Sequence, residues 1–287
     1  MKIEFFKMHG AGNDYVYIDC FKTPPPNPEE LARVVSPRHF SIGSDGLILV
    51  LPSDVADGRM RMFNADGSEG KMCGNGIRCV GKLLFDLGYV KKSEITVETA
   101  SGVKGLKLLI DGERRIGASV DMGRASFKKT DIPFVSEGDA TIYTSPAGFE
   151  FTCLSMGNPH AVTFVKGVES LDIESPGKAL QISPAFPQGA NAEFCGLLPP
   201  EQPASPPDSI RMRVWERGSG ETMACGTGAC ACVAAGIKNG LLSHGKEYKV
   251  VLNGGTLYIK ADSDYNMTMT GDAKLVYRGI FDYVDEN

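Results

Sequence analysis

The chain has 287 residues and a formal net charge of −5, from 30 Lys and Arg against 35 Asp and Glu. At roughly 150 residues per domain, this length predicts about two domains, each with enough core to fold without a disulfide or metal. Hydrophobic residues at 42% and charged residues at 23% exclude collagen, coiled coil and disorder as descriptions of the whole chain. An acidic chain without a basic cluster argues against nucleic acid as a partner.

The same composition argues against a membrane or an oxidising compartment. No apolar run approaches the roughly 18 residues of a membrane helix, and no signal-peptide core follows the N-terminus. The eight cysteines include no C-x-x-C spacing, so we expect core thiols rather than zinc ligands or a disulfide framework. The sequence therefore predicts a cytoplasmic protein without a metal site.

Hydrophobic patterning predicts many short strands and few helices, in chain order. The predicted helices cover residues 29–35, 74–87 and 226–238, the last two buried and followed by glycine. The predicted strands cover residues 95–99, 210–215, 256–260 and 274–284. We interpret the proline-rich stretches 24–28 and 199–207 as exposed loops.

A weak internal repeat is centred on two cysteines, Cys73 and Cys225, which stand 152 positions apart. Each opens the pattern Cys-Gly-x-Gly at the start of a predicted buried helix. At the same offset Glu69 aligns with Glu221, while Gly-Asn turns before both recur at an offset of 145. The repeat indicates two domains of one architecture related by duplication.

A cysteine at a helix N-terminus is suited to acid–base chemistry. A free thiol has a pKa near 8.5, and the helix dipole favours its anion by about 0.3–1 kcal/mol. The glycines leave backbone N–H groups open to bind a carboxylate or oxyanion. Two such sites could remove a proton from one face of a carbon and return one to the other, with one thiolate and one thiol at rest.

The simplest alternative for a single Cys-Gly-x-Gly is a tight turn before a helix. Two copies at equivalent positions favour a function instead. Nucleotide binding is disfavoured, because Gly74-Asn75-Gly76 lacks the third glycine of a dinucleotide fingerprint and Gly70-Lys71 is not a P-loop.

Several longer motifs, taken together, resemble the diaminopimelate epimerase family in order along almost the whole chain. They are Lys7–Asp14 (KMHGAGND), Phe63–Glu69 (FNADGSE) leading to Cys73–Cys79 (CGNGIRC), Met156–His160 (MGNPH), Ala190–Ala192 (ANA), and Trp215–Gly218 (WERG) leading to Ala224–Gly228 (ACGTG). Proline racemases share the two-cysteine plan but usually carry His where this chain has Asn75.

The resemblance implies a mixed α/β fold of two pseudo-symmetric domains, each a curved, mostly antiparallel sheet or barrel around a central helix, with the active site in the cleft between them. We place the first domain at residues 1–118 plus 274–287 and the second at 119–273. It further implies a cofactor-independent homodimeric isomerase that converts LL- to meso-diaminopimelate for lysine and peptidoglycan synthesis.

By position, the resemblance implies Cys73 and Cys225 as the acid–base pair. His160 and Glu216 would tune the thiols. The residues expected to bind substrate are Asn13, Asn64, Gly74, Asn75, Asn158, Asn191, Glu216, Arg217, Gly226 and Thr227. Amides with a carboxylate and a guanidinium suit the far, non-reacting amino-acid end of diaminopimelate.

The chain departs from the family pattern in two places. Gly43, within Ser41–Gly46, stands where some members carry a substrate-contacting glutamine, and the proline-rich stretch 199–207 is longer than usual. Two other readings stay open. One is an isomerase for proline, hydroxyproline or another amino acid, which would leave Glu216 and Arg217 unpaired. The other is a non-enzymatic thiol switch, for which we hypothesise a Cys73–Cys225 disulfide.

Overall fold

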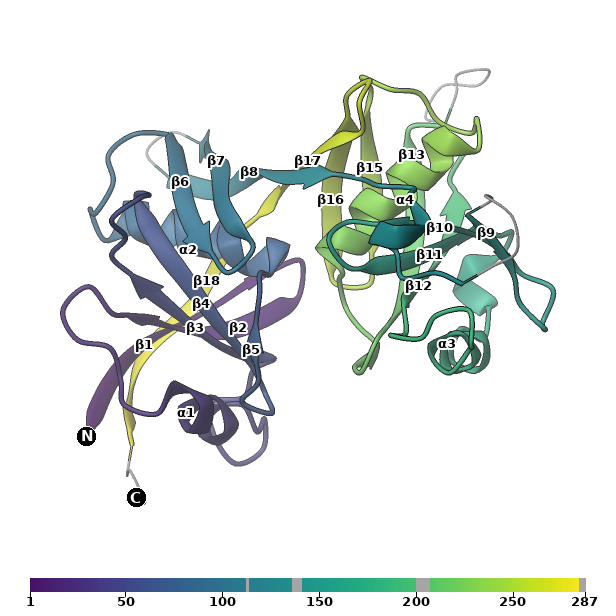
Figure 1. Cartoon of the computed structure of the whole chain (residues 1–287). Coiled ribbons are helices and arrows are strands. Elements are labelled where there is room, and N and C mark those ends of the chain that lie inside the picture. Colours follow the sequence, from purple (N-terminus) through teal and green to yellow (C-terminus); the bar gives the residue numbers. More distant parts are fainter. Residues whose placement is uncertain (112–113, 136–140, 200–206, 284–287) are drawn as a thin grey trace. The chain divides into compact units, whose positions relative to one another are not determined.

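The computed structural model describes residues 1–111, 114–135, 141–199 and 207–283. By its contacts the chain divides into two compact units, unit 1 (Met1–Val120 with Thr270–Asn287) and unit 2 (Asp121–Met269), which Figure 1 colours along the sequence. The chain passes between the units in strands β8 (Arg114–Arg124) and β17 (Asn266–Asp272). The boundaries proposed from sequence, after residues 118 and 273, fall in or directly after these two strands.

Unit 1 is dominated by a sheet that begins and ends with the chain. Besides β8, its elements are β1 (Lys2–Gly10), β2 (Asn13–Asp19), α1 (Pro28–Val35), β3 (Gly46–Leu51), β4 (Gly58–Asn64), β5 (Glu69–Gly70), α2 (Gly74–Asp86), β6 (Glu94–Thr99), β7 (Gly102–Asp111) and β18 (Lys274–Asp282). Strands β2 and β3 pair parallel, as do β4 and β6. The pairs β18–β1, β1–β2, β3–β4, β4–β5, β6–β7 and β7–β8 are antiparallel.

Unit 2 contains the rest of the described elements. They are η1 (Lys129–Asp131), β9 (Ile142–Thr144), β10 (Glu150–Ser155), β11 (Pro159–Phe164), η2 (Val168–Ser170), α3 (Glu174–Gln181), β12 (Asn191–Leu197), β13 (Ser209–Glu216), β14 (Gly220–Glu221), α4 (Gly226–Lys238), β15 (Glu247–Leu252) and β16 (Gly255–Ala261). Here β11–β12 and β13–β15 are the parallel pairs. The pairs β9–β10, β10–β11, β12–β13, β13–β14 and β15–β16 are antiparallel.

The pairing patterns of the two units match element by element. Strands β1 to β7 of unit 1 correspond to β10 to β16 of unit 2, with parallel and antiparallel pairs in the same places. The helices follow the same order, because α1 and α3 precede the third strand while α2 and α4 follow the short fifth one. This topology confirms the duplicated, mixed α/β architecture expected from the cysteine repeat.

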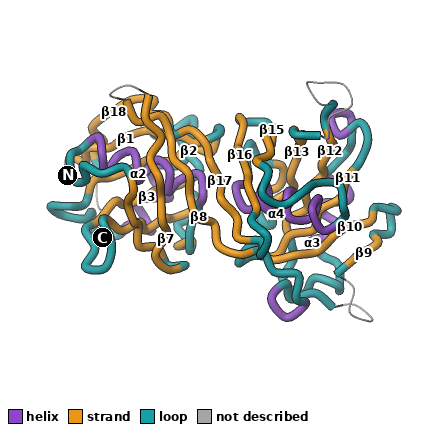
Figure 2. Tube along the Cα trace, turned by 90° about the horizontal axis from the view of Figure 1, so that it is seen from above, coloured by secondary structure: helices purple, strands orange, loops and turns teal. Residues whose placement is uncertain are grey.

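Each unit is built around one buried helix, visible among the strands in Figure 2. Helix α2 packs against β1, β2, β3, β4, β6 and β7, and α4 against β10, β11, β12, β13 and β16. All but two residues of α4 are buried. Its small alanine and cysteine side chains allow strands to pack closely around every side of the helix. A helix that is apolar on every side must be buried. Because α4 is fixed by packing on all sides, the residues at its N-terminus are held in place.

The predicted elements are confirmed with small changes at their ends. The three expected helices are α1, α2 and α4, and the four expected strands are β6, β13, β16 and β18. Helix α3 was not expected, because Pro176 and Gly177 interrupt its pattern. Of the proline-rich stretch 199–207, residues 200–206 lie outside the described residues. No helix in the described part of the chain is long and apolar enough to span a membrane.

Candidate active site

The two repeat cysteines occupy the same position in their units. Cys73 is the N-cap of α2 and Cys225 is the N-cap of α4, both with extended backbone angles. The Cys73 sulfur accepts the backbone N–H of Gly76 at 3.3 Å, and the Cys225 sulfur accepts that of Gly228 at 3.4 Å. Each sulfur thus takes one free N–H of a helix start, where partial positive charge favours a thiolate.

Matched ion pairs fix the hairpins that lead into the two cysteines. Arg61 of β4 contacts Glu69 of β5 through two hydrogen bonds of 2.8 and 3.0 Å. Arg213 of β13 contacts Glu221 of β14 in the same way, at 2.8 and 2.9 Å. Both residues of the second pair stand 152 positions after those of the first. Paired guanidinium and carboxylate groups therefore orient the approach to both thiols.

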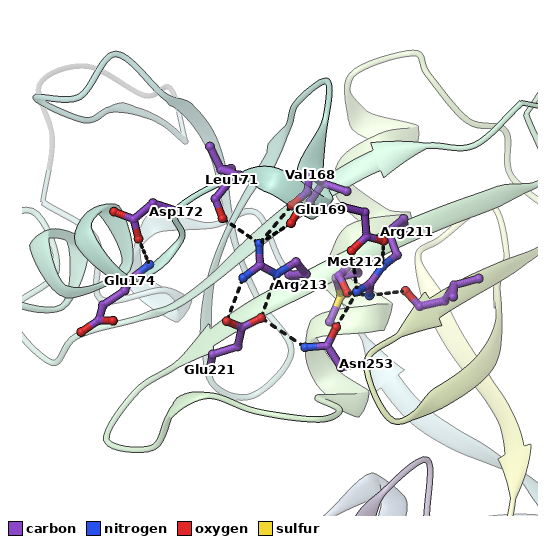
Figure 3. A network of polar contacts seen from close by, with 11 residues as sticks. Val168, Glu169, Leu171, Asp172, Glu174, Arg211, Met212, Arg213, Glu221 and Asn253 are labelled. Atoms are coloured by element: carbon purple, nitrogen blue, oxygen red, sulfur yellow. Dashed lines mark hydrogen bonds and ion pairs between the residues drawn. The ribbon is translucent and has the colours of Figure 1, made fainter.

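Figure 3 shows how the unit 2 pair extends into a wider network. The Arg213 guanidinium also donates to the carbonyls of Val168 and Leu171, at 3.1 and 2.7 Å. Arg211, one pleat away on β13, donates to the Glu169 carboxylate and to the Asn253 side chain. These contacts hold β13 against η2 and β14, so the end of β13 that carries Glu216 is firmly placed.

In unit 1, Cys73 lies in an amide environment and is partly exposed. Its sulfur is 3.2 Å from the Asn13 side-chain oxygen, which also lies 3.5 Å from the Asn75 amide nitrogen. Asn13 donates to Asp45 at 2.7 Å. The buried Arg78 fixes the Asn75 side chain by donating to its Oδ1 at 3.0 Å. Unit 1 therefore brings together Asn13, Cys73 and Asn75, as expected.

Asn64, the remaining expected residue of unit 1, stands at the exposed end of β4. Its amide donates to the Ser68 hydroxyl at 2.9 Å. This end of β4 pairs with Gly46, next to Asp45. Asn64 therefore lies at the same edge of the sheet as Asn13, with its contact directed to a turn rather than to the thiol.

In unit 2, Cys225 is only 5% exposed and is surrounded by acidic groups. Burial raises the pKa of the Cys225 thiol well above its ordinary value, and the charges of Glu216 and Glu193 raise it further. Hydrogen bonds from Thr227 and from the Gly228 N–H act in the opposite direction. The Thr227 oxygen lies 3.5 Å from the sulfur. These surroundings favour the neutral thiol at rest.

His160 reaches Cys225 through two intermediate side chains. It is fully buried, and its Nε2 lies 3.0 Å from Asn158 Oδ1. The Asn158 amide nitrogen donates to the Thr227 hydroxyl at 3.4 Å. His160, Asn158 and Thr227 thus form a continuous polar chain that ends at the sulfur.

Glu216, Asn191 and Arg217 meet at the end of β13. Burial raises the pKa of the Glu216 carboxyl, which accepts the Thr222 hydroxyl at 2.5 Å. Asn191 accepts the Arg217 backbone N–H at 2.8 Å, while the exposed Arg217 guanidinium donates to the Gln188 carbonyl at 2.7 Å. A carboxylate, an amide and a guanidinium therefore share one edge of unit 2.

Glu193 is a residue that the motif analysis missed. It lies in β12, is fully buried, and its Oε1 is 2.7 Å from His160 Nδ1. Its other oxygen, Oε2, is buried without a hydrogen-bond partner. The available signal was a carboxylate between Ala192 and Phe194, in a strand whose other residues after Asn191 are apolar, since such a residue needs a specific partner.

No metal centre is formed by the described residues, since no three His, Cys, Asp or Glu side chains come together as they would around an ion. The structure instead presents two thiols, each capping a buried helix and each beside amide or acidic groups. An arrangement of this kind can exchange protons with a carbon acid.

Comparison with known proteins identifies the class. The fold matches a hydroxyproline epimerase from Agrobacterium vitis, with a TM-score of 0.69, 17% identity and coverage of 97% of this chain and 92% of that one. A PhzF-family protein from Bacillus anthracis matches with a TM-score of 0.68 and 18% identity, over 99% of this chain and all of the other. The chain thus has the two-domain, pseudo-symmetric fold of these proteins.

The sequence comparisons are more specific. The family model for diaminopimelate epimerase matches residues 5–128 and 152–276. A diaminopimelate epimerase from Methanococcus maripaludis is 46% identical over 285 residues, covering 98% of this chain and all of its own length. One from Desulfovibrio desulfuricans is 47% identical over 288 residues, with coverage of 96% and 97%. This chain belongs to the diaminopimelate epimerase family, and it is an epimerase.

Proposed function

We propose that the protein interconverts LL- and meso-2,6-diaminopimelate by a two-cysteine acid–base mechanism that requires no cofactor. The observation that carries this proposal is the equivalent placement of Cys73 and Cys225, each the N-cap of a buried helix opened by glycine. The relatives named for this reaction match along nearly the whole chain.

The proposed reaction moves one proton off the α-carbon and one onto it. A thiolate takes the α-proton as its C–H bond breaks, and the electron pair passes into the neighbouring carboxylate. The second cysteine, as thiol, then delivers its proton to the opposite face of the same carbon. The stereocentre is inverted, and the two sulfurs have exchanged protonation states.

The helix starts supply the stabilisation that this step needs. Charge builds on the substrate carboxylate in the transition state. The backbone N–H groups of Gly74, Asn75, Gly226 and Thr227 lie in the first turns of α2 and α4, at the positive ends of the helix dipoles, which suit an oxyanion. Because burial and two nearby carboxylates raise the pKa of the Cys225 thiol, we assign it as the proton donor in one direction. Cys73 is then the base, and the roles reverse for the other direction.

The distal amino-acid end of the substrate is assigned to the polar edges of the units. Its carboxylate suits the Arg217 guanidinium, and its ammonium suits Glu216 and the oxygens of Asn64 and Asn191. Proline and hydroxyproline lack a second charged end and would leave these groups unpaired. This difference favours diaminopimelate over the cyclic amino acids.

The cellular setting follows from the substrate. The reaction would supply meso-diaminopimelate for lysine and for peptidoglycan precursors, in the cytoplasm, and the active form would be a homodimer. Size-exclusion chromatography with light scattering would test the last point.

The function is tested by incubating the reduced protein with LL-diaminopimelate, without added pyridoxal phosphate or metal, and separating the stereoisomers chromatographically. We expect the meso isomer to accumulate, with no turnover of L-proline or trans-4-hydroxy-L-proline. Folded protein that turns over a cyclic amino acid and leaves diaminopimelate unchanged would overturn the assignment.

A further inference from the structure

The two thiol environments differ most at one position beneath the helix start. At the offset of 145 that aligns Asn13 with Asn158, Ile48 aligns with Glu193. The strand registers agree, since Tyr17 pairs with Ile48 and Val162 pairs with Glu193. A methyl group added at Gly76 would meet Ile48, and one added at Gly228 would meet Glu193 Oε1 at 2.7 Å. Equivalent positions of the two units therefore carry an isoleucine beside the start of α2 and a carboxylate beside the start of α4.

Burying a carboxylate lowers the stability of the fold unless the carboxylate is paired and hydrogen-bonded. Glu193 is fully buried and pairs with His160, while its Oε2 makes no hydrogen bond. An isoleucine at the equivalent position shows that the fold does not need an acid there. The His160 ring, at 0% exposure, is itself at the position that Tyr15 holds in unit 1. The two units therefore differ at both positions, and we attribute both differences to the chemistry of Cys225.

We propose that Glu193 is the positioning residue for His160: it keeps a hydrogen on Nδ1, so that Nε2 alone connects through Asn158 and Thr227 to Cys225. The carboxylate oxygen 2.7 Å from Nδ1 can only accept. The tautomer of a histidine is set by such a bond. This role rests on the proposed function, which needs Cys225 to alternate between thiol and thiolate.

The chain from Nε2 to the sulfur can run in either direction. With a hydrogen on Nε2, His160 donates to Asn158 Oδ1, the Asn158 amide donates to Thr227, and the Thr227 hydroxyl donates to a thiolate. The structure has this orientation, with steps of 3.0, 3.4 and 3.5 Å. Because Glu193 also accepts from Nδ1, this arrangement places a hydrogen on each ring nitrogen and suits a Cys225 thiolate. With a lone pair on Nε2 and the amide turned over, every donor reverses, and Thr227 accepts from the Cys225 thiol. Both protonation states of the sulfur are therefore satisfied.

The electrostatic neighbours of Glu193 come from three elements. They are His160 on β11, Glu216 on β13, and Cys225 and Cys232 on α4. Among these, only His160 makes a hydrogen bond to the Glu193 carboxylate in the described contacts. The carboxylate therefore acts on Cys225 chiefly through the histidine ring that it holds.

Glu193→Ile is the sharpest test, because unit 1 shows that isoleucine fits beneath the helix start. With no acceptor at Nδ1, the hydrogen should move to Nε2, where Asn158 Oδ1 accepts it in the structure. Ring ¹⁵N NMR of His160 should then show a hydrogen on Nδ1 in the wild type and on Nε2 alone in the variant. We expect kcat to fall at least about tenfold, while thermal unfolding stays cooperative. Glu193→Gln keeps an acceptor oxygen and should retain Nδ1–H and more of the turnover.

The control is Glu150→Gln, which removes an exposed carboxylate of the same unit and should change neither readout. Nδ1–H in Glu193→Ile, or unchanged kcat in a folded Glu193→Ile protein, would overturn the proposal. The NMR readout needs no turnover, so it distinguishes this failure from failure of the proposed function. In the latter case, wild-type protein would not epimerise diaminopimelate, whatever the tautomer of His160.

Discussion

Cys73 and Cys225 have the same backbone setting but different side-chain surroundings. Cys73 is partly exposed beside amides, whereas Cys225 is 5% exposed beside Glu193 and Glu216. Burial and both carboxylates raise the pKa of the Cys225 thiol, which favours the neutral thiol. In the proposed mechanism, this asymmetry assigns opposite resting protonation states to the two cysteines.

The first prediction concerns their reactivity. With iodoacetamide at pH 7.5 and no substrate, Cys73 should be alkylated at least about tenfold faster than Cys225, because the thiolate is the nucleophile. Peptide mass spectrometry over a time course measures both rates in one sample. Equal rates, or faster alkylation of Cys225, would contradict the assigned resting states.

The sequence motifs were sufficient to find the cysteines and most polar neighbours, but not Glu193. Short patterns such as Asn-Pro-His mark residues close to each other in the chain. The contact between Glu193 and His160 joins strands β11 and β12, 33 residues apart, and depends on a parallel register. A single sequence carries no direct trace of that register.

At the scale of elements, the two helix starts tolerate extra volume differently. A Cβ at Gly76 would meet the Ile48 methyl at 2.6 Å, which a small rotation can relieve. A Cβ at Gly228 would meet Glu193 Oε1, which is fixed by its bond to His160, and would also lie 3.3 Å from the Cys225 sulfur.

The second prediction follows from this difference. Gly228→Ala should lower kcat by about tenfold or more and lower the thermal unfolding temperature, because overpacking typically costs about 1–3 kcal/mol. Gly76→Ala, its matched counterpart in unit 1, should lose clearly less of both. Calorimetry and the epimerisation assay measure the pair. Equal losses in the two variants would show that the helix starts are packed alike.

The third prediction concerns the hairpin ion pairs and acid. The Arg61 hydrogen bonds lower the pKa of Glu69, and those of Arg213 lower the pKa of Glu221. Each folded-state pKa lies below its unfolded value of about 4.3. Each pair therefore stabilises the fold above that pH, and the contribution is lost as pH falls through the folded pKa.

We therefore expect Glu69→Gln and Glu221→Gln to flatten the decline of stability between about pH 5 and pH 3, each by less than about 1 kcal/mol. Urea unfolding across this range provides the measurement. Glu94→Gln, at an exposed position outside any ion pair in the described contacts, is the control. If the free energy of unfolding fell as steeply with pH in both variants as in the wild type, the hairpin ion pairs would not contribute to acid sensitivity.

The elements themselves were largely predictable, for physical reasons. Helices α2 and α4 begin at glycines and carry long apolar patterns, and β13 alternates buried Ile210, Met212 and Val214 with arginines. Helix α3 escaped prediction because its eight residues include proline and glycine, which packing against β12 and β13 overrides. The pairing order of the strands is a long-range property that no local pattern contains.

At the scale of the whole molecule, duplication supplies two similar units whose thiols have different surroundings. Unit 1 contributes an amide-lined thiol, and unit 2 contributes a buried thiol with an acidic and imidazole-linked environment. In the proposed mechanism, one thiol is the base and the other is the acid, and two copies of one half-site would provide both.

The fourth prediction concerns oxidation of the substrate-free protein. If both thiols serve one carbon, a thiol oxidant such as diamide should join Cys73 to Cys225 in a disulfide, with diamide reduced to the hydrazine. Activity should disappear and return with dithiothreitol. Peptide mapping identifies the pair. Recovery of both cysteines as free thiols after inactivation would reject the disulfide.

The most direct test of the two-thiol mechanism is the reaction of LL-diaminopimelate in D₂O, followed from its first per cent by NMR and mass spectrometry. With separate acid and base, newly formed meso product should carry one deuterium at its inverted carbon, while the remaining LL substrate is still protonated. Cys73→Ala and Cys225→Ala should abolish the conversion while keeping the fold. Deuterium appearing equally early in substrate and product, or near wild-type turnover in either variant, would contradict the mechanism.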